Sequence, residues 1–394
     1  NMAITLTNEA QKDNCTISIL CEDVESFSNF INPADNAKPF QLPYGYAIRG
    51  KERVSSYTKL LRFFGIFLKS YGYIFLHNNF NKPLPTKGFY SYIKEIKQAD
   101  LIVGMGGGYL TTNDKYKDYF GLGLTLLPIY IAKMYKKRQL LLPMSFGPFA
   151  SEAQKNMAYD AIKDTTIISR DHITLNQLQK IDKHNQLTTY YSPDLALHFK
   201  NKEIPLKKKL ASNYIALTAR EWFPEKEKQK FYEKSLVDLI DKLWKDSKLK
   251  TIFIPMARNV IEDDDNRVAK RIQQQIKDKK SFSIFTPQSL AEVQDALGNA
   301  KISICTRMHS AILSTTVHTP FIAIGYGHKT LGFVKSFGIE KWHIDIHDVT
   351  FNNLYEKYLA LSEKENYVEF ISLVKKKQTD IKKYRSNILK ELTI

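Results

Sequence analysis

Cationic and polar side chains follow two short apolar segments in the last third of the chain. Arg307, His309 and Ser310 come directly after the apolar run 302–305. Lys329 follows a second apolar run, at 321–324. Guanidinium and ammonium groups bind phosphate and carboxylate, and an imidazole exchanges protons near neutral pH. This spacing indicates an anion-binding site beside a general acid or base.

The two apolar runs have the length of buried strands, and residues 308–317 between them have the length and the apolar face of a helix. A strand–helix–strand unit pairs its strands in parallel through a right-handed crossover. Ligands of such sheets bind outside the carboxyl ends of the strands. We therefore expect the polar residues after both runs to meet on one edge of a sheet.

Strand and helix patterns alternate along most of the chain and are interrupted by a Lys-rich segment at 200–210, which we predict to be the linker between domains. A chain of 394 residues is longer than a domain with a single hydrophobic core usually is. We predict an α/β protein of two doubly wound, Rossmann-like domains facing a cleft, with a C-terminal helix packing across both. The predicted boundaries are 1–204 for the first domain, 205–350 for the second and 351–394 for the C-terminal helices.

A run of glycines follows the predicted strand 101–103. We expect Gly106, Gly107 and Gly108 to form a flexible loop at the carboxyl end of that strand. Backbone N–H groups of such a loop can approach an anion, although a tight turn without a ligand explains the pattern equally well. The spacing is that of neither a dinucleotide fingerprint nor a P-loop.

Further polar residues follow other predicted strands. Arg170 and Arg220 each come at the end of a β-rich run. Ser151 and Asp171 have the positions of helix N-caps, and Asp194 follows Pro193 at the end of another run. Asp194 is therefore either a general base or acceptor contact, or a turn residue.

The formal net charge of +17 suggests an anionic partner or a solvated Lys-rich surface. No RNA-binding signature accompanies the charge, so we predict no nucleic-acid partner. A solvated surface is the favoured interpretation. Attraction to anionic lipid head groups or to a lipid-linked glycan is the alternative that we keep open.

Cys15, Cys21 and Cys305 form no disulfide or zinc pattern, which fits a reducing cytoplasm. Residues 3–14 are polar, so we expect no signal peptide, and no apolar run approaches the length of about 18 residues of a membrane span. The acidic run 262–265 is weighed as a metal site, but acids favour a helix N-terminus and its spacing suits ligation poorly. We predict no metal.

The segment from Arg307 to Ser310, followed by Pro320, Tyr326 and Lys329, resembles the polysaccharide pyruvyl transferase family. The segments 106–110, 170–174 and 192–194 also resemble family motifs, and the resemblance spans roughly residues 95 to 340. It implies a GT-B-like fold and a reaction that transfers the pyruvate unit of phosphoenolpyruvate to a sugar. Two sugar hydroxyls form a cyclic ketal and phosphate leaves, without a metal or an organic cofactor.

The resemblance also implies roles for the residues already singled out. The first domain would bind the acceptor, a glycan or a lipid-linked sugar, and the second would bind phosphoenolpyruvate. The expected catalytic residues are His309 and Asp194. The expected substrate-binding residues are Arg307, Lys329, Arg170, Arg220, Ser310, Gly106, Gly107 and Gly108.

One family feature is missing, because no Asn-x-Gly-Asp segment follows the first predicted strand. The segments 32–36 and 43–47 are the candidates for that place. Two alternatives stay open, and the departure motivates the second of them. One is a GT-B glycosyltransferase that uses a nucleotide sugar, and the other is a glycan-binding relative without catalysis.

Overall fold

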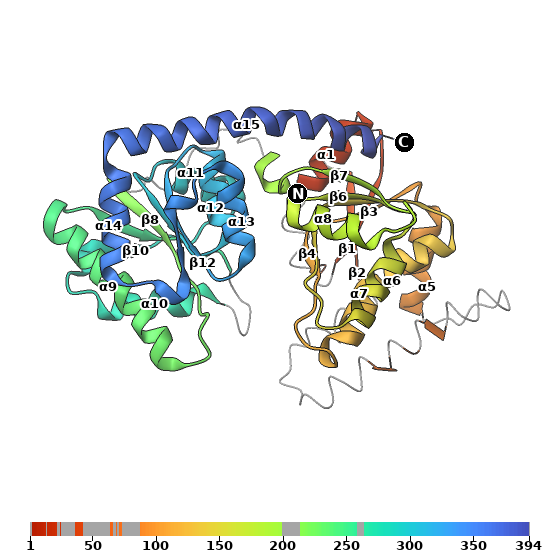
Figure 1. Ribbon diagram of the computed structural model, residues 1–394, viewed down its shortest axis with the longest axis horizontal. Coiled ribbons are helices and arrows are strands. Elements are labelled where there is room, and N and C mark those ends of the chain that lie inside the picture. Colours follow the sequence, from red (N-terminus) through yellow and green to blue (C-terminus); the bar gives the residue numbers. More distant parts are fainter. Residues whose placement is uncertain are drawn as a thin grey trace. The chain divides into compact units, whose positions relative to one another are not determined.

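The computed structural model describes residues 2–12, 14–21, 36–41, 87–198, 213–257 and 264–393, and isolated positions between 24 and 72. The chain forms two compact units (Figure 1). Unit 1 comprises residues 1–195 and 382–394, and unit 2 comprises residues 196–381. The segment 200–210, predicted as a linker, lies outside the described residues.

Unit 2 is built on a six-stranded parallel sheet in the order β10-β9-β8-β11-β12-β13. The chain builds from β8 towards one edge, then returns to the other side of β8 and builds towards the opposite edge. A topological switch point therefore lies between β8 and β11, where sheets of this class bind ligands. The strands are β8 (Tyr214–Thr218), β9 (Lys250–Phe253), β10 (Phe282–Ile284), β11 (Ser303–Cys305), β12 (Phe321–Gly325) and β13 (His343–Asp345).

Helices cover both faces of this sheet. Ile215 and Leu217 of β8 share a core with the helices α9 and α10, whereas Tyr214 and Ala216 share a core with α11. This alternation is the doubly wound arrangement predicted from the sequence. The helices are α9 (Lys226–Ser247), α10 (Asp265–Gln275), α11 (Leu290–Gly298), α12 (Met308–Thr316), α13 (His328–Phe337), α14 (Phe351–Ser362) and the first part of α15 (Lys364–Leu392), with short 3-10 turns at Lys279–Ser281, Glu340–Trp342 and Ile346–Asp348.

Unit 1 contains a second parallel sheet, in the order β3-β5-β6-β7, with β4 paired to the end of β5. A separate parallel pair joins β1 to β2. The strands are β1 (Ile17–Cys21), β2 (Ala37–Gln41), β3 (Leu101–Gly104), β4 (Gly107–Leu110), β5 (Arg138–Phe146), β6 (Thr166–Ser169) and β7 (Thr188–Tyr191). The helices are α1 (Met2–Gln11), α5 (Lys87–Gln98), α6 (Lys117–Met134), α7 (Glu152–Ile162) and α8 (His172–Ile181), and a 3-10 turn spans Leu195–His198.

The central strand β5 is buried on both faces, as expected of a continuous apolar run in a parallel sheet. Leu141 packs with α6, α7 and α8. Leu140 and Leu142 pack instead with Leu6 of α1 and with Ile388 near the end of α15. The sheet of unit 1 is therefore also covered on both sides.

The long helix α15 contributes side chains to the cores of both units. Phe370, Val374 and Ile381 belong to the core of unit 2, and Ile388 and Leu392 belong to the core of unit 1. The prediction of a C-terminal helix packing on both domains is confirmed.

Two helix N-caps predicted from the sequence are present. The side chain of Ser151 accepts a hydrogen bond from the N–H of Gln154, and that of Asp171 accepts one from Thr174. The prediction of parallel strands on either side of the helix at 308–317 is also confirmed.

Several elements were not predicted, among them α5, α13 and β13. Residues 2–11 form a helix with Leu6 fully buried, residues 37–41 form β2, and the expected glycine loop contains β4. Gly107 and Gly108 lie in this short strand, so the loop after β3 shrinks to Met105 and Gly106. Glycine has little strand propensity, and the pairing with β5 decides the conformation.

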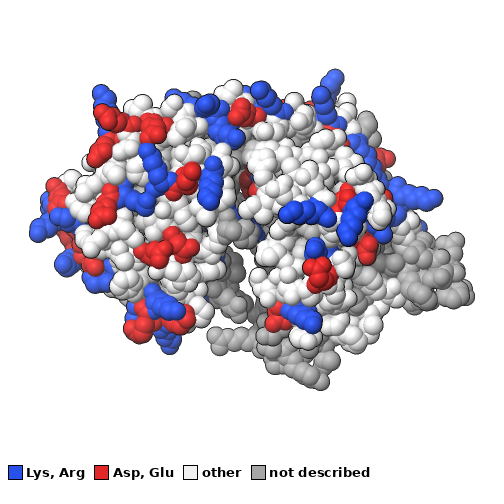
Figure 2. Space-filling model, viewed as in Figure 1, with Lys and Arg blue, Asp and Glu red and all other residues white. Residues whose placement is uncertain are grey.

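None of the helices in the described part of the chain combines the length and the apolar character that crossing a membrane requires. On the face shown in Figure 2, Lys and Arg side chains lie among Asp and Glu side chains. On α9, Lys228 pairs with Glu225 and Lys230 pairs with Glu227 one helical turn away. Such exposed pairs stabilise little and are typical of a solvated surface.

Phe370 anchors α15 on unit 2, because it is 1% exposed and its ring lies edge-on to that of Phe321, with centroids 5.1 Å apart. We predict that Phe370→Ala lowers the free energy of unfolding by about 3–5 kcal/mol. All three tryptophans of the chain, Trp222, Trp244 and Trp342, belong to unit 2, so denaturation followed by tryptophan fluorescence reports on this unit.

The matched control is Val368→Ala on the same helix, since Val368 is 57% exposed. It should change the free energy of unfolding by no more than about 0.5 kcal/mol. Equal effects of the two substitutions would contradict the anchoring role of Phe370.

Candidate functional site

Hydrogen bonds join the end of β8 to the start of α12 at the switch point of unit 2. The hydroxyl of Ser310 donates to the carbonyl oxygen of Arg307 at 2.6 Å, and its Oγ lies 2.9 Å from Oγ1 of Thr218. Oγ1 of Thr218 also accepts the N–H of Thr306 at 3.1 Å. Ser310 and Thr306 are fully buried. Ser310, predicted as a substrate contact, therefore links two elements beneath the surface.

A buried carboxylate fixes the side chain of Arg307. Oδ1 of Asp265 accepts hydrogen bonds from Nε and Nη2 of Arg307, at 3.2 and 2.6 Å. Oδ2 of Asp265 accepts the N–H groups of Met256 and Ala257, both at 2.9 Å. Since these two residues follow β9, a single carboxylate connects the ends of β9 and β11 and sets the direction of the guanidinium.

Burial raises the pKa of the Asp265 carboxyl, and the Arg307 guanidinium together with the two backbone N–H groups opposes that shift. The sequence presented Asp265 only as part of an acidic run before a helix. One signal could have identified Asp265. It is the first residue of α10, the helix that follows β9, and β9 is the neighbour of β8 in the sheet.

Arg220, directly after the end of β8, lies against two aromatic rings. Its guanidinium carbon is 4.6 Å from the ring centroid of Tyr326 and 5.4 Å from that of Trp222, and the two rings are 4.5 Å apart. Cation–π attraction stabilises such an arrangement. Tyr326 directly follows β12, so the contact connects the ends of β8 and β12. Trp222 was not recognised from the sequence.

Buried Gln229 of α9 braces this segment. Its Oε1 accepts the N–H groups of Trp222 and Phe223, and its Nε2 donates to the carbonyl oxygen of Arg220 at 3.3 Å. The turn that carries Arg220 is therefore held by the helix that follows it.

His309 and Lys329 occupy equivalent places in two consecutive strand–helix segments of unit 2. His309 is the second residue of α12 and is exposed, and Lys329 is the second residue of α13 and is half-buried. Each of these helices follows a strand, β11 or β12, and the two strands are hydrogen-bonded neighbours. The predicted site residues of the second domain thus all follow β8, β11 or β12 at one edge of the sheet.

The predicted residues of unit 1 form a second group. Nη1 of Arg170 donates to Oδ2 of Asp194 at 3.3 Å, and its Nε donates to Oγ of Ser145 at 2.7 Å. The hydroxyl of Ser145 donates to Oδ2 of Asp171 at 3.2 Å. The Arg170 side chain is only 8% exposed, so in this structure it binds Asp194 and joins the ends of β5, β6 and β7.

Gly106 is required by packing. A Cβ atom at this position would lie 2.6 Å from the carbonyl oxygen of Pro143 and 3.2 Å from Cδ1 of Leu195. Gly107 has a φ of +149°, in the region that favours glycine. Packing at Gly106 and the backbone conformation of Gly107 explain these two glycines without a ligand. The role of Gly106, Gly107 and Gly108 in anion binding stays a prediction.

In the described segments, no three His, Cys, Asp or Glu side chains come together as metal ligands would. Residues 262 and 263 of the acidic run lie outside those segments.

We predict that Asp265→Ala lowers the free energy of unfolding by about 3–5 kcal/mol, because it removes the buried carboxylate that binds the largely buried guanidinium of Arg307. In a double-mutant cycle with Arg307→Ala, the coupling energy should be about 1–3 kcal/mol. Tryptophan fluorescence during denaturation measures all four proteins of the cycle.

The exposed pair Lys234 and Asp238 on α9 serves as the control cycle. Its coupling energy should not exceed about 0.5 kcal/mol. If the coupling between Asp265 and Arg307 is as small as that of the surface pair, the carboxylate does not hold the arginine.

We predict that Gly106→Ala destabilises unit 1 by about 1–3 kcal/mol, because the new methyl group meets a backbone carbonyl that cannot rotate away. Scanning calorimetry measures the effect. Gly121→Ala within α6 is the control, since its Cβ would meet open space, and alanine there should stabilise the protein by about 0.4–1 kcal/mol. An unchanged transition in Gly106→Ala would show that the backbone at Pro143 shifts freely.

Known proteins of similar fold carry low sequence identity to this chain. The UDP-GlcNAc 2-epimerase from Neisseria meningitidis, solved bound to UDP-GlcNAc, aligns with a TM-score of 0.61 over 99% of this chain and 95% of that one, at 13% identity. A glycosyltransferase from Rickettsia africae aligns with a TM-score of 0.54 over 98% and 95%, at 11% identity. These likenesses show the fold, and they confirm the GT-B-like arrangement of two Rossmann-like domains.

Sequence comparison identifies the family. The amylovoran biosynthesis protein AmsJ of Erwinia amylovora is 23% identical over 302 residues, which cover 71% of this chain and 68% of that protein. The sequence profile of the polysaccharide pyruvyl transferases matches residues 10–328. The match includes Arg170, Arg220, Arg307 and His309, and it confirms the resemblance seen in the motifs. The chain belongs to the polysaccharide pyruvyl transferase family, whose members are transferases that modify glycans.

Proposed function

We propose that this protein transfers the pyruvate unit of phosphoenolpyruvate to a sugar of a polysaccharide or of a lipid-linked glycan precursor. The product is a cyclic pyruvate ketal, and phosphate is released. The observation that carries the proposal is the gathering of Arg220, Arg307, Lys329 and His309 at the carboxyl edge of one sheet, beside its switch point.

The donor presents a carboxylate and a phosphate within a few bonds of each other. Arginine binds either group through paired N–H donors, and lysine supplies a compact charge. Asp265 fixes the direction of Arg307, and the rings of Trp222 and Tyr326 fix Arg220. Two preoriented guanidinium groups lose little freedom when the donor binds, which favours its capture.

The chemistry requires one proton to be added and two to be removed. One sugar hydroxyl adds to C2 of phosphoenolpyruvate while C3 receives a proton and becomes a methyl group. A second hydroxyl then forms the other C–O bond at C2, and the C–O bond to phosphate breaks. One hydroxyl proton is thereby balanced by the new C–H bond, and the other leaves with phosphate or solvent.

We assign the proton transfer at C3 or at the attacking hydroxyl to His309, which is exposed on the first turn of α12. Lys329 and the backbone N–H groups in the first turn of α12 would balance the phosphate charge. In unit 1 we assign Arg170, Asp194 and the segment Gly106–Gly108 to the acceptor, with Asp194 receiving a hydrogen bond from a sugar hydroxyl.

We place the enzyme in the cytoplasm, and at the inner face of the membrane when the acceptor is lipid-linked. The net charge of +17 supports an attraction to anionic lipid or to the phosphates of such an acceptor.

We predict that phosphoenolpyruvate binds saturably to the wild-type protein in calorimetric titration, and that Arg307→Ala weakens binding about 10- to 100-fold. The expected loss is that of one or two hydrogen bonds between charged groups. The control is Arg267→Ala, which removes an exposed arginine of α10 two residues from Asp265 and should change the affinity less than about twofold.

Two outcomes would replace the proposal with its alternatives. If phosphoenolpyruvate does not bind while a nucleotide sugar does, the protein is a glycosyltransferase of this fold. If phosphoenolpyruvate binds but no glycan acceptor yields a ketal or releases phosphate, the protein is a non-catalytic relative.

A further inference from the structure

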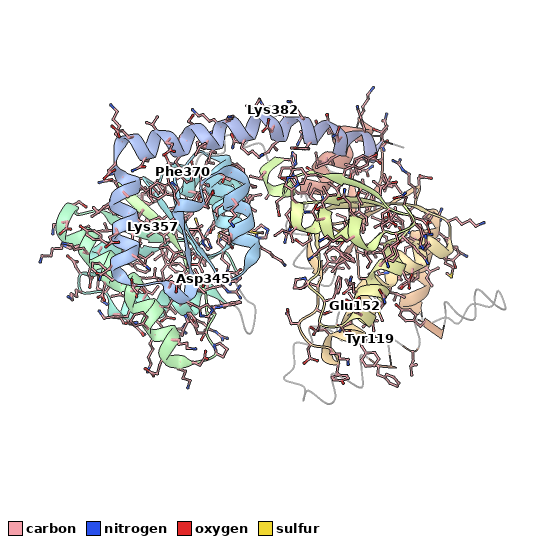
Figure 3. All side chains as sticks on the ribbon, viewed as in Figure 1. Tyr119, Glu152, Asp345, Lys357, Phe370 and Lys382 are labelled. Atoms are coloured by element: carbon pink, nitrogen blue, oxygen red, sulfur yellow. The ribbon has the colours of Figure 1, made fainter. Side chains whose placement is uncertain are left out.

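A buried carboxylate on α9 belongs to the support of the turn that carries Arg220. Glu233 is 2% exposed, and its Oε1 and Oε2 accept hydrogen bonds from Nη2 and Nε of Arg271 on α10, at 2.6 and 3.0 Å. The helices α9 and α10 pack against each other in unit 2, with side chains of both between them (Figure 3). Glu233 therefore joins the helix that supports Arg220 to the helix that begins with Asp265.

This carboxylate decides how the amide of Gln229 is oriented. Oε1 of Glu233 accepts a hydrogen bond from Nε2 of Gln229 at 2.7 Å. An ionised carboxylate accepts and cannot donate, so the amide turns its nitrogen towards Glu233 and its oxygen away from it. That oxygen accepts the N–H groups of Trp222 and Phe223, at 3.0 and 3.2 Å. Because Nε2 also donates to the carbonyl oxygen of Arg220, all four hydrogen-bonding positions of the amide are used.

An amide turned the other way would lose all of these hydrogen bonds. Its oxygen would face the carboxylate of Glu233 and the carbonyl oxygen of Arg220, and its NH2 group would face two backbone N–H groups. Gln229 is buried, and unpaired polar groups in a buried place are costly. The turn at 220–223 would have to move to relieve them. Glu233 therefore holds Arg220 and the neighbouring Trp222 in place through a single amide.

The cation that matches the charge of Glu233 is Arg271. Its side chain is 36% exposed, and its Nη1 also lies 3.4 Å from Oε2 of the exposed Glu221. An ion pair with a buried partner contributes little net stability, because the cost of desolvation offsets most of the attraction. Apolar residues of similar size could fill the same space. What they could not do is set the direction of the Gln229 amide.

We propose that Glu233 is a positioning residue for the phosphoenolpyruvate site. It acts through Gln229, which fixes the turn 220–223, and it thereby sets the backbone from which the Arg220 guanidinium reaches Trp222 and Tyr326. This inference rests on the proposed function only in naming phosphoenolpyruvate as the ligand of Arg220. The orientation of the amide is a property of the free protein, so it can be tested without any ligand.

The first readout is fluorine NMR of the full chain labelled with fluorotryptophan. Trp222→Phe identifies the resonance of Trp222 by removing it, and Trp244 and Trp342 serve as internal references. Glu233→Leu should shift or broaden the resonance of Trp222 and leave the other two unchanged. The control is Glu227→Leu, which removes an exposed carboxylate of the same helix and should leave all three resonances in place.

A second pair of variants separates orientation of the amide from packing. Gln229→Glu places two carboxyl groups side by side, and the negative neighbour raises the pKa of the new group. At low pH the protonated group donates to Glu233 as the amide does, so the resonance of Trp222 should match that of the wild type at the same pH. At high pH the two negative charges repel each other, and the resonance should move. The charged groups around the pair are Arg271, Glu221 and Arg220.

The double variant Gln229→Glu with Glu233→Gln exchanges the two side chains. The new carboxylate can accept the N–H groups of Trp222 and Phe223, and the new amide can donate to that carboxylate and accept from Arg271. The double variant should restore the wild-type resonance of Trp222 and remove the pH dependence of Gln229→Glu. A residue that only fills space would show neither the pH dependence nor the recovery.

Calorimetric titration with phosphoenolpyruvate supplies the last readout. Glu233→Leu should weaken binding about three- to tenfold, because Arg220 is still present but is no longer held in place. The double variant should recover most of this loss, and Glu227→Leu should bind as the wild type does.

The inference is overturned if Glu233→Leu leaves the resonance of Trp222 unchanged, or if it shifts the resonance without weakening phosphoenolpyruvate binding. It is also overturned if the single and double exchange variants give the same spectra at high pH, and this comparison decides the matter if Glu233→Leu does not fold. A wild type that binds no phosphoenolpyruvate would contradict the proposed function instead. The fluorine spectra would then still decide whether Glu233 positions the turn.

Discussion

The carboxylate of Asp265 is the interaction on which the candidate site of unit 2 depends. It accepts hydrogen bonds from the end of β9 on one oxygen and from Arg307 on the other. Parallel strands are joined by long crossovers, so no tight turn fixes the relative positions of their carboxyl ends. A buried carboxylate with four donors supplies that constraint. It simultaneously holds a guanidinium whose charge would otherwise be costly to bury.

Unit 1 uses the same device with different residues. Arg170 at the end of β6 binds Asp194 after β7 and Ser145 within β5, and its side chain is nearly buried. In each unit an arginine that follows a strand is paired with a carboxylate that follows another strand. The two pairs differ in which partner is more accessible. In unit 2 it is the arginine, with Arg307 at 13% and Asp265 at 1%, and in unit 1 it is the carboxylate, with Asp194 at 15% and Arg170 at 8%. This accessible surface is what a bound substrate could contact.

The fold and the chemistry of this protein come from different levels of its structure. Epimerases and glycosyltransferases share the two-domain arrangement at 13% identity or less. The arrangement supplies strand ends and switch points, and the side chains placed there decide which reaction follows. Here those side chains are two arginines, a lysine and a histidine in unit 2. This set is the basis of the donor site that we propose.

The sequence by itself determined most strands and helices, the N-caps at Ser151 and Asp171, and the common edge shared by Arg307 and Lys329. These features depend on local periodicity and on position relative to a strand end, which neighbouring residues specify. The tertiary structure alone decided that Asp265 binds Arg307, that Ser310 is buried and that glycines 107 and 108 form a strand. Each of these depends on which strands are neighbours, and the order β9-β8-β11 is set by packing between segments far apart in the chain.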